Sequence, residues 1–195
     1  MKNIQKKIGV LLAMAIVFTS ILPVRADEKV NISMKRIGGE NRYITAIESS
    51  KDSYPEKTDN IILVSGENYA DALVAGTIAA KLDAPILLTK SKDLGSDVEK
   101  EIDRLSPKNI YIIGGENSVS SSIFHKLESK ANVSRLAGKN RYETSVDVAN
   151  KLIDMGCTKG IAYASGNNYA DALSGGAFLA KLEGYSLILT NGKEI

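Results

Sequence analysis

The chain has few of the side chains that support metal binding, disulfide bonding or nucleophilic catalysis. It contains one cysteine, Cys157, and one histidine, His125, among 195 residues. A single cysteine excludes an intramolecular disulfide, and a tetrahedral zinc site is implausible because such sites need several Cys or His ligands. We expect Cys157 to be a small buried apolar residue, with an intermolecular bridge as the alternative.

Long apolar runs are also scarce. The one extended run, Ile8 to Leu22, follows a basic start and precedes the sequence Val24-Arg25-Ala26, which resembles a small-x-small cleavage site. The run is too short to cross a bilayer comfortably, so residues 1–26 are predicted to be a cleaved signal peptide. A buried N-terminal helix or a retained membrane helix is the alternative. We therefore expect a secreted protein that meets the membrane only through this signal.

The charge balance does not favour a nucleic-acid partner. The chain carries 25 basic and 23 acidic residues, a formal net charge of +2. Four basic residues and no acidic ones lie in residues 1–26, so the remainder has 21 basic against 23 acidic residues and a net charge of −2. We expect no binding to nucleic acid. Any binding of an anionic ligand must come from local clusters of basic side chains.

What the chain has in abundance is internal repetition. The segment Ser65–Leu73 returns 100 residues later as Ser165–Leu173, with Asn167 in place of Glu67. The flanking segments agree as well: Arg36–Tyr43 with Arg135–Tyr142, and Ile86–Thr89 with Leu187–Thr190. A domain-sized period means a repeated structural unit that could bury a core of its own.

Helix-like and strand-like segments alternate within the first repeat. Continuous apolar strands predict burial on both faces of a parallel sheet, and strict alternation with helices predicts right-handed crossovers. The expected fold class is α/β, in tandem units that each have a mostly parallel sheet flanked by helices. The expected strands are 60–64, 85–89, 109–113 and 133–136, and the expected helices are 41–53, 69–82, 95–105 and 119–127.

The predicted organisation is a signal peptide over 1–26, a first repeat over 27–134 and a second over 135–195. The second repeat reaches only the counterpart of Ile86–Thr89, so we expect it to be incomplete and the chain to be a fragment. An unfinished parallel sheet leaves apolar surface and strand edges uncovered, which predicts that the second repeat is the less stable of the two.

Helices 69–82 and 169–182 are rich in small residues, among them Ala72, Gly76, Gly175 and Gly176. Small side chains let a helix approach its neighbours closely. Two arrangements fit this composition. The helix packs tightly against its own sheet, or it packs one repeat against the other.

Each repeat also places an asparagine and an aspartate where a strand gives way to a helix. The spacing of Asn68 with Asp71, and of Asn168 with Asp171, predicts a capping box in which each side chain bonds the other residue's backbone N–H. Capping accounts for the spacing without a ligand. Because open α/β sheets bind ligands at strand carboxyl ends, the same residues are candidates for a ligand loop.

Catalysis has little support in these motifs. Ser65 lacks the flanking glycines of a nucleophile elbow, and His125 has no counterpart in the second repeat. The nearest acid pair, Glu67 with Asp71, is not preserved because Asn167 replaces the glutamate. We therefore predict no catalytic residue, no cofactor and no metal site.

An Arg-Tyr pair recurs in both repeats, as Arg42-Tyr43 and Arg141-Tyr142. An arginine can bind phosphate or carboxylate with two parallel hydrogen bonds, and an adjacent tyrosine can stack on a sugar face. These four residues are candidates for binding an acidic polysaccharide. The alternative is that each arginine pairs with an Asp or Glu in a connecting loop.

Together these motifs resemble the cell wall binding repeat 2 family of tandem repeats on clostridial-type surface proteins. The resemblance rests on Arg-x-x-Gly-x-x-Arg-Tyr-x-Thr, on Ser-Gly-x-Asn-Tyr-Ala-Asp-Ala-Leu, and on the Ala-Pro-Ile-Leu-Leu that begins at Ala84. It implies non-covalent, non-catalytic anchoring to an anionic secondary wall polymer at the cell surface. It also implies three repeats with pseudo-threefold symmetry, and a link between polymer binding and Ile86, Leu87 and Leu88.

The second repeat departs from this pattern, since Ser186 replaces Pro85 and the triplet reads Leu187-Ile188-Leu189. Two other functions stay open beside wall anchoring. One is a peptidoglycan hydrolase. The other is a structural component that associates with itself or with other surface-layer proteins.

Overall fold

The computed structural model describes residues 33–157, 159–182 and 184–193. The predicted signal peptide, residues 1–26, lies outside the described residues. Every helix and strand of the described residues lies within residues 36–195. Within the described part of the chain, no helix has the length and apolar character needed to span a bilayer.

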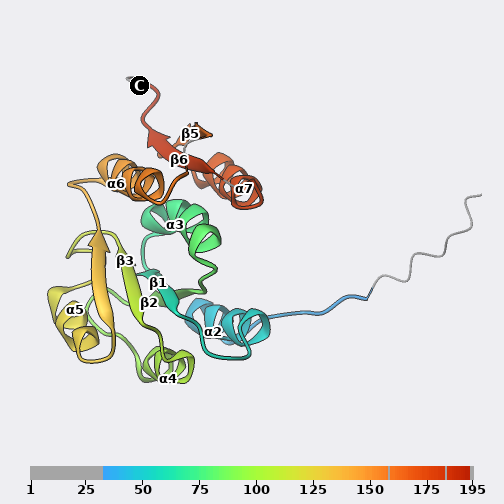
Figure 1. The fold of residues 1–195 in the computed structure, drawn as a ribbon, viewed down its shortest axis with the longest axis vertical. Helices are drawn as coiled ribbons and strands as arrows, with labels where there is room; N and C mark the ends of the chain where they lie inside the picture. Colours follow the sequence, from blue (N-terminus) through green and yellow to red (C-terminus); the bar gives the residue numbers. More distant parts are fainter. Residues whose placement is uncertain (1–32, 158, 183, 194–195) are drawn as a thin grey trace, which may run out of the picture. The chain divides into compact units, whose positions relative to one another are not determined.

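The first repeat forms a four-stranded parallel sheet in the order β2-β1-β3-β4 (Figure 1). All four predicted strands are present, within a residue of their expected bounds. The pairing register joins Ile62 to Ile86 on one side and to Tyr111 on the other. The strands are β1 (Asn60–Ser65), β2 (Ile86–Thr89), β3 (Asn109–Ile113) and β4 (Asn132–Leu136).

Burial of β1 shows why the sequence forms a central strand. Ile61, Ile62, Leu63 and Val64 all have no exposed surface. Because successive side chains point to opposite faces, Ile61 and Leu63 enter one core and Ile62 and Val64 the other. This confirms the expectation, drawn from continuous apolar runs, of a parallel sheet covered on both faces.

Four helices flank this sheet, at the positions that the sequence predicts. The amphipathic helix α4 buries Val98, Ile102 and Leu105, the three residues spaced for one helix face. Together with α2 and α5 it covers one face of the sheet, and α3 covers the other. The helices are α2 (Arg42–Ser53), α3 (Tyr69–Leu82), α4 (Ser96–Leu105) and α5 (Ser121–Glu128).

The second repeat begins the same way and has a two-stranded parallel sheet among the described residues. Its elements are α6 (Arg141–Asp154), β5 (Gly160–Ser165), α7 (Tyr169–Ala180) and β6 (Tyr185–Thr190). Strand β4 pairs with β3 of the first repeat although Arg135, within it, starts the second repeat's motif. The predicted boundary between residues 134 and 135 therefore falls inside a strand.

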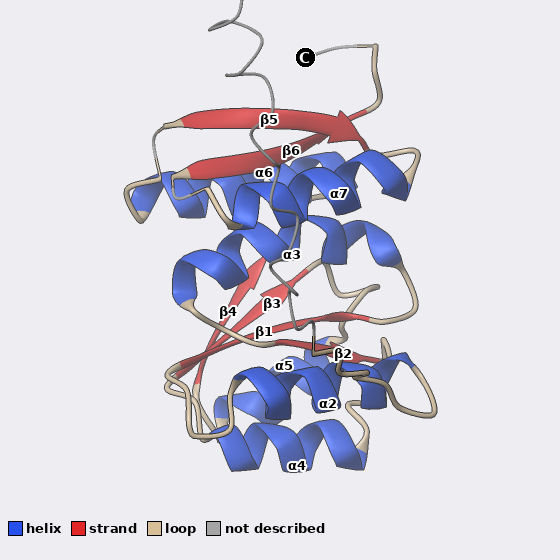
Figure 2. Ribbon diagram, turned by 90° about the vertical axis from the view of Figure 1, so that its right-hand side faces the viewer, coloured by secondary structure: helices blue, strands red, loops and turns tan. Residues whose placement is uncertain are grey.

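Helix α3 packs against its own sheet and also against α6, α7 and β6 of the second repeat (Figure 2). The approach to α7 is close, since a Cβ added at Gly176 would lie 3.2 Å from the Leu73 carbonyl oxygen. The small residues of α3 and α7 thus allow both arrangements that the sequence left open. The helix packs against its own sheet, and it also packs one repeat against the other. Val74, Ala75 and Ile78 of α3 have no exposed surface as a result.

Within the described residues, nothing covers the outer face of β5, in contrast to β1. Ile161 and Tyr163 are 43% and 51% exposed, whereas the equivalent Ile61 and Leu63 are completely buried. In the first repeat that face lies beneath α2, α4 and α5, and β3 occupies the neighbouring edge. The exposed apolar side chains that the sequence predicted for the second repeat are therefore present in the structure.

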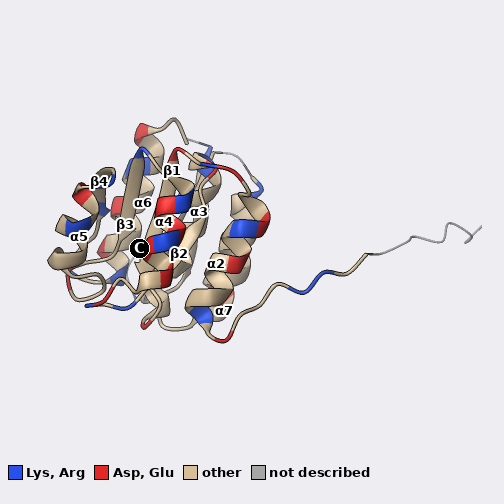
Figure 3. Ribbon diagram, turned by 90° about the horizontal axis from the view of Figure 1, so that it is seen from below, with Lys and Arg blue, Asp and Glu red and all other residues tan. Residues whose placement is uncertain are grey.

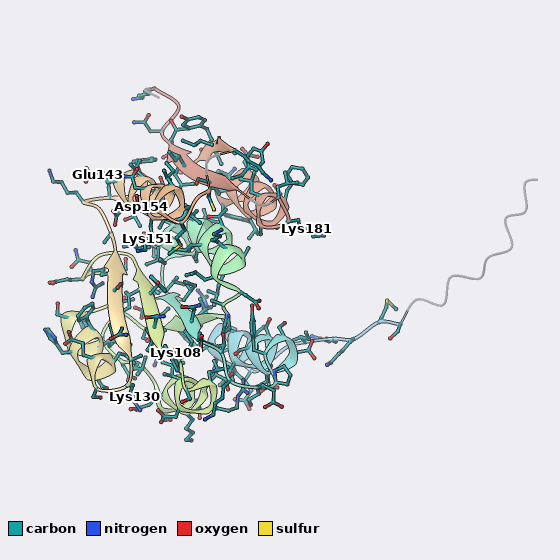
Figure 4. All side chains as sticks on the ribbon, in the orientation of Figure 1. Lys108, Lys130, Glu143, Lys151, Asp154 and Lys181 are labelled. Atoms are coloured by element: carbon teal, nitrogen blue, oxygen red, sulfur yellow. The ribbon has the colours of Figure 1, made fainter. Side chains whose placement is uncertain are left out.

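Charged residues of both signs are interspersed over α2 and α4 (Figure 3). Lys108 follows α4 and Lys130 follows α5, whereas Lys151 and Lys181 lie on the second repeat (Figure 4). Lys108 pairs with Asp59 at 2.9 Å, with both side chains well exposed. Ion pairs this exposed add little to stability.

A buried carboxylate joins α2 to α4. Glu101 is 2% exposed and accepts hydrogen bonds from Ser50 Oγ at 2.6 Å and from Arg104 Nη2 at 2.7 Å. Arg104 also donates to the Tyr54 carbonyl at the end of α2. Burial tends to raise the pKa of Glu101, but the bonds from Arg104 and Ser50 outweigh it and hold the pKa below its ordinary value.

We predict that Glu101→Ala lowers the free energy of unfolding by about 3 kcal/mol, because it leaves Ser50 and Arg104 without their buried acceptor. Urea denaturation followed by circular dichroism measures this loss. The matched control is Lys100→Ala on the same helix, where the side chain is 76% exposed and a change under about 0.5 kcal/mol is expected. Equal stabilities of the two variants would contradict the prediction.

Candidate functional site

The two most repeated motifs bind each other within each repeat. Arg42 Nη1 donates to the Gly66 carbonyl at 2.5 Å, and Arg141 Nη1 donates to the Gly166 carbonyl at 2.6 Å. The arginine at the start of one helix thereby fixes the loop that leaves the following strand. The sequence also allowed each arginine to pair with an Asp or Glu in a connecting loop. That alternative is wrong for this contact, because the acceptor is a backbone carbonyl.

The tyrosine beside each arginine packs on the same loop. A Cβ added to Gly66 would lie 2.6 Å from Tyr43 Cε1, and one added to Gly166 would lie 2.6 Å from Tyr142 Cε1. Only glycine leaves room for the ring. The Arg-Tyr and Ser-Gly motifs therefore recur together because they form one packed junction, and polymer binding by these residues stays a prediction.

Asparagines begin the helices at these junctions. Asn68 Oδ1 accepts from the Ala70 N–H at 3.0 Å, and Asn168 Oδ1 accepts from the Ala170 N–H at 3.1 Å. Helix capping by both residues is thus present. The predicted reciprocal capping box is wrong in its partners, because neither asparagine accepts from the aspartate three residues later.

Asp71 is directed to a different loop. It is 7% exposed and accepts a hydrogen bond of 2.6 Å from Ser118 Oγ, in the loop after β3. Burial raises the pKa of the Asp71 carboxyl above its ordinary value, and the Ser118 hydrogen bond and the Arg141 charge offset only part of that rise. Asp171, its counterpart in the second repeat, is exposed.

A polar cleft of about 450 Å³ lies beside Asp71, where the two repeats meet. Loops that follow β1, β3 and β4 form its walls, together with the start of α6. It therefore opens at the carboxyl ends of parallel strands, where open α/β sheets bind ligands. Its lining residues are Asn68, Ala70, Asp71, Gly115, Glu116, Asn117, Ser118, Gly138, Lys139, Asn140, Arg141 and Thr144.

The structure brings only part of the predicted set to this cleft. Asn68, Asp71 and Arg141 line it, whereas Arg42, Tyr43 and Tyr142 do not. The sequence reasoning missed Glu116, Asn117, Ser118 and Lys139. The one sequence feature that could have pointed to them is the position of Glu116–Ser118, directly after the turn Gly114-Gly115 that ends a predicted strand.

The Ile86-Leu87-Leu88 triplet forms strand β2 at the edge of the first sheet. Leu87 has no exposed surface, and Ile86 and Leu88 are half-buried against the core beneath α3. These side chains contribute packing to the sheet. Their link to polymer binding stays a prediction. Because these side chains are buried or half-buried, an indirect effect, in which the strand holds the adjoining loop in place, fits best.

The residues considered for catalysis have different contact partners. Glu67 accepts from the Ser91 backbone N–H at 2.8 Å in the loop after β2, whereas Asp71 is bound to Ser118. Hydrogen bonds from the Ser91 hydroxyl and, to a smaller extent, from its backbone N–H lower the pKa of Glu67. His125 is exposed and pairs with Glu128 at 2.8 Å, and Cys157 is buried and free. Among the described residues, no His, Cys, Asp and Glu side chains gather into a metal-binding group.

Comparison with known proteins agrees with the fold and with the presence of two repeats. Residues 36–124 and 135–195 each match the cell wall binding domain 2 (CWB2) family. The chain belongs to this family. Two solved structures resemble this CWB2 chain: Cwp6 from Clostridium difficile, at a TM-score of 0.72 and 31% identity, and Cwp8 from the same organism, at 0.73 and 38%. The matches cover 86% and 79% of this chain, but 28% and 27% of those chains.

Two Bacillus subtilis proteins are also similar to the CWB2 chain. One is the N-acetylmuramoyl-L-alanine amidase LytC, 37% identical over 164 residues, and the other is an amidase enhancer, 36% identical over 155 residues. The matches cover 84% and 80% of this chain, and 32% and 21% of those relatives. The chain thus spans about a third or less of their length.

The Arg-Tyr junction predicts an unequal response to two glycine substitutions. Gly66→Ala should lower the free energy of unfolding by about 1–3 kcal/mol, because the new methyl group displaces the Tyr43 ring. Gly76→Ala is the matched control, since a Cβ there meets nothing within 4 Å and alanine favours the helix by about 0.5–1 kcal/mol. Thermal unfolding of both variants tests this, and a stable Gly66→Ala protein would refute the packing argument.

The raised pKa of Asp71 predicts a specific pH dependence of stability. Between about pH 4, where the unfolded carboxyl titrates, and the higher folded pKa, the native state binds more protons, so this residue's contribution falls as pH rises. Asp71→Asn removes that component. The wild type should lose stability relative to Asp71→Asn as the pH rises from about 3.5 to 7 in urea titrations, and parallel curves would contradict the assignment.

Proposed function

We propose that the chain binds an anionic secondary polymer of the bacterial wall without covalent attachment, and so holds an exported protein at the cell surface. The observation that carries this proposal is the polar cleft between the repeats of a CWB2 chain. Its opening at strand carboxyl ends and its size of about 450 Å³ suit several sugar residues or a phosphate-linked unit.

The side chains of the cleft suit a polymer that carries both hydroxyl groups and negative charge. Lys139 and Arg141 provide cations, and the amides of Asn68 and Asn117 provide donors and acceptors for sugar hydroxyls. Asp71 and Glu116 line the same cleft, and a charged carboxylate there repels an anion that comes near it. We infer that the anionic groups lie toward Lys139 and Arg141 and that neutral hydroxyls face the carboxylates.

Binding in this cleft needs both repeats. Asn68, Asp71 and Ser118 come from the first repeat, and Lys139, Asn140 and Arg141 from the start of the second. A single repeat would present only one wall. This gives tandem repetition a role in forming the site, in addition to any gain in avidity from linked sites.

The direct test uses purified cell wall before and after acid removal of its anionic polymer. We expect the mature chain to sediment with intact wall and to stay in solution with stripped wall, because the charged ligand is gone. A sample without wall controls for self-association. Equal sedimentation with both wall preparations would overturn the proposal and would favour peptidoglycan itself as the ligand.

A charge substitution locates the binding to the cleft. Lys139→Gln should weaken binding to soluble wall polymer about two- to fivefold and reduce its salt dependence, because one cation of the cleft is lost. Lys100→Gln removes the same charge from an exposed position on α4 and is the matched control. Titrations at low and high salt measure both, and identical affinities of the two variants would exclude the cleft.

A further inference from the structure

Two tyrosines from equivalent positions of the two repeats form an exposed pair. Tyr69 is the first residue of α3 and Tyr169 the first residue of α7. Their ring centroids are 5.7 Å apart with an interplanar angle of 70°, the edge-to-face arrangement that aromatic pairs prefer. Even so, 46% of Tyr69 and 56% of Tyr169 is exposed to solvent.

Arg141 joins this pair to the polar cleft. Its guanidinium carbon lies 5.8 Å from the centroid of the Tyr69 ring, and the same side chain lines the cleft. Its bond to the Gly166 carbonyl holds it in place. The aromatic surface and the cleft are therefore continuous, with one cation between them.

Surfaces of this composition suit a pyranose ring. One face of a pyranose carries C–H groups that pack on an aromatic ring, while its hydroxyls stay in water or bind polar neighbours. The other motif tyrosines are used differently, since Tyr43 and Tyr142 pack against Gly66 and Gly166 and are half-buried. Capping does not require aromatic side chains at 69 and 169, because the asparagine caps precede them.

We propose that Tyr69 and Tyr169 form a sugar-stacking subsite that receives the polymer where it leaves the cleft beside Arg141. This inference rests on the proposed function and adds to it the ligand's chemical class: a polymer with pyranose units next to its anionic groups. Stacking supplies affinity that salt does not screen, in contrast to the charge contacts of the cleft.

The chain has no tryptophan, which allows a direct spectroscopic test. Tyr69→Trp and Tyr169→Trp each place a single indole at the subsite, and Tyr163→Trp places one on β5, where the native tyrosine is 51% exposed. On addition of purified wall polymer, we expect emission to shift to shorter wavelength for the first two proteins only. Unchanged spectra at both subsite positions, while the wild type still sediments with wall, would overturn the subsite but not wall binding.

Truncation of the Tyr169 side chain tests how much stacking contributes to polymer binding. Tyr169→Ala should weaken polymer binding about three- to tenfold at both low and high salt, while Tyr169→Phe keeps the ring and the wild-type affinity. Tyr163→Ala is the matched control and should bind like the wild type. Equal binding by Tyr169→Ala and wild type would overturn the proposal. So would an emission shift that follows protein concentration without polymer, because the tyrosines would then contact another protein surface.

Discussion

The structure depends on the burial of helix α3 between the first sheet and the second repeat. Its residues pack against the first sheet on one side and against α6, α7 and β6 on the other. A helix so enclosed must be made of small and aliphatic residues, and Val74, Ala75 and Ile78 have no exposed surface. This constraint fixes how the repeats meet, because Gly176 brings α7 against the α3 backbone. The two repeats thereby share one apolar core cluster.

That shared core places the cleft. With α3 and α6 in contact, the loop after β3 and the start of α6 are held on the same edge of the first sheet as the start of α3. Asp71 and Arg141, which belong to different repeats, then line one polar space. Each Arg-Tyr junction ties the start of a helix to the loop between the next strand and the helix that follows it. The proposed wall binding uses a surface that neither repeat has by itself.

The repeats have the same junctions but different surroundings. Asp71 is buried against Ser118, whereas Asp171 is exposed. Likewise Leu73 is 7% exposed and its counterpart Leu173 is 60% exposed. Identical motif residues thus have different roles, because α3 has neighbours on both sides and α7 is covered on fewer sides within the described residues. A motif alone does not specify the burial or the pKa of the residues in it.

Local sequence pattern was enough to predict the helices and strands and their order. Apolar runs with β-branched residues specified strands such as 60–64, and spacing of Val98, Ile102 and Leu105 specified a helix, because periodicity is a local property. The 100-residue repeat specified tandem units, and its motifs identified the family. Local pattern also indicated that asparagines begin the helices, though not which N–H each would bind.

The contacts between segments far apart in the chain could be known only from the folded structure. It paired Arg42 with the Gly66 carbonyl, Asp71 with Ser118, and Glu101 with Ser50. It also decided that β4 joins the first sheet although it carries the start of the second repeat's motif. The partners in these contacts are far apart in the chain, and no short window of sequence contains both of them.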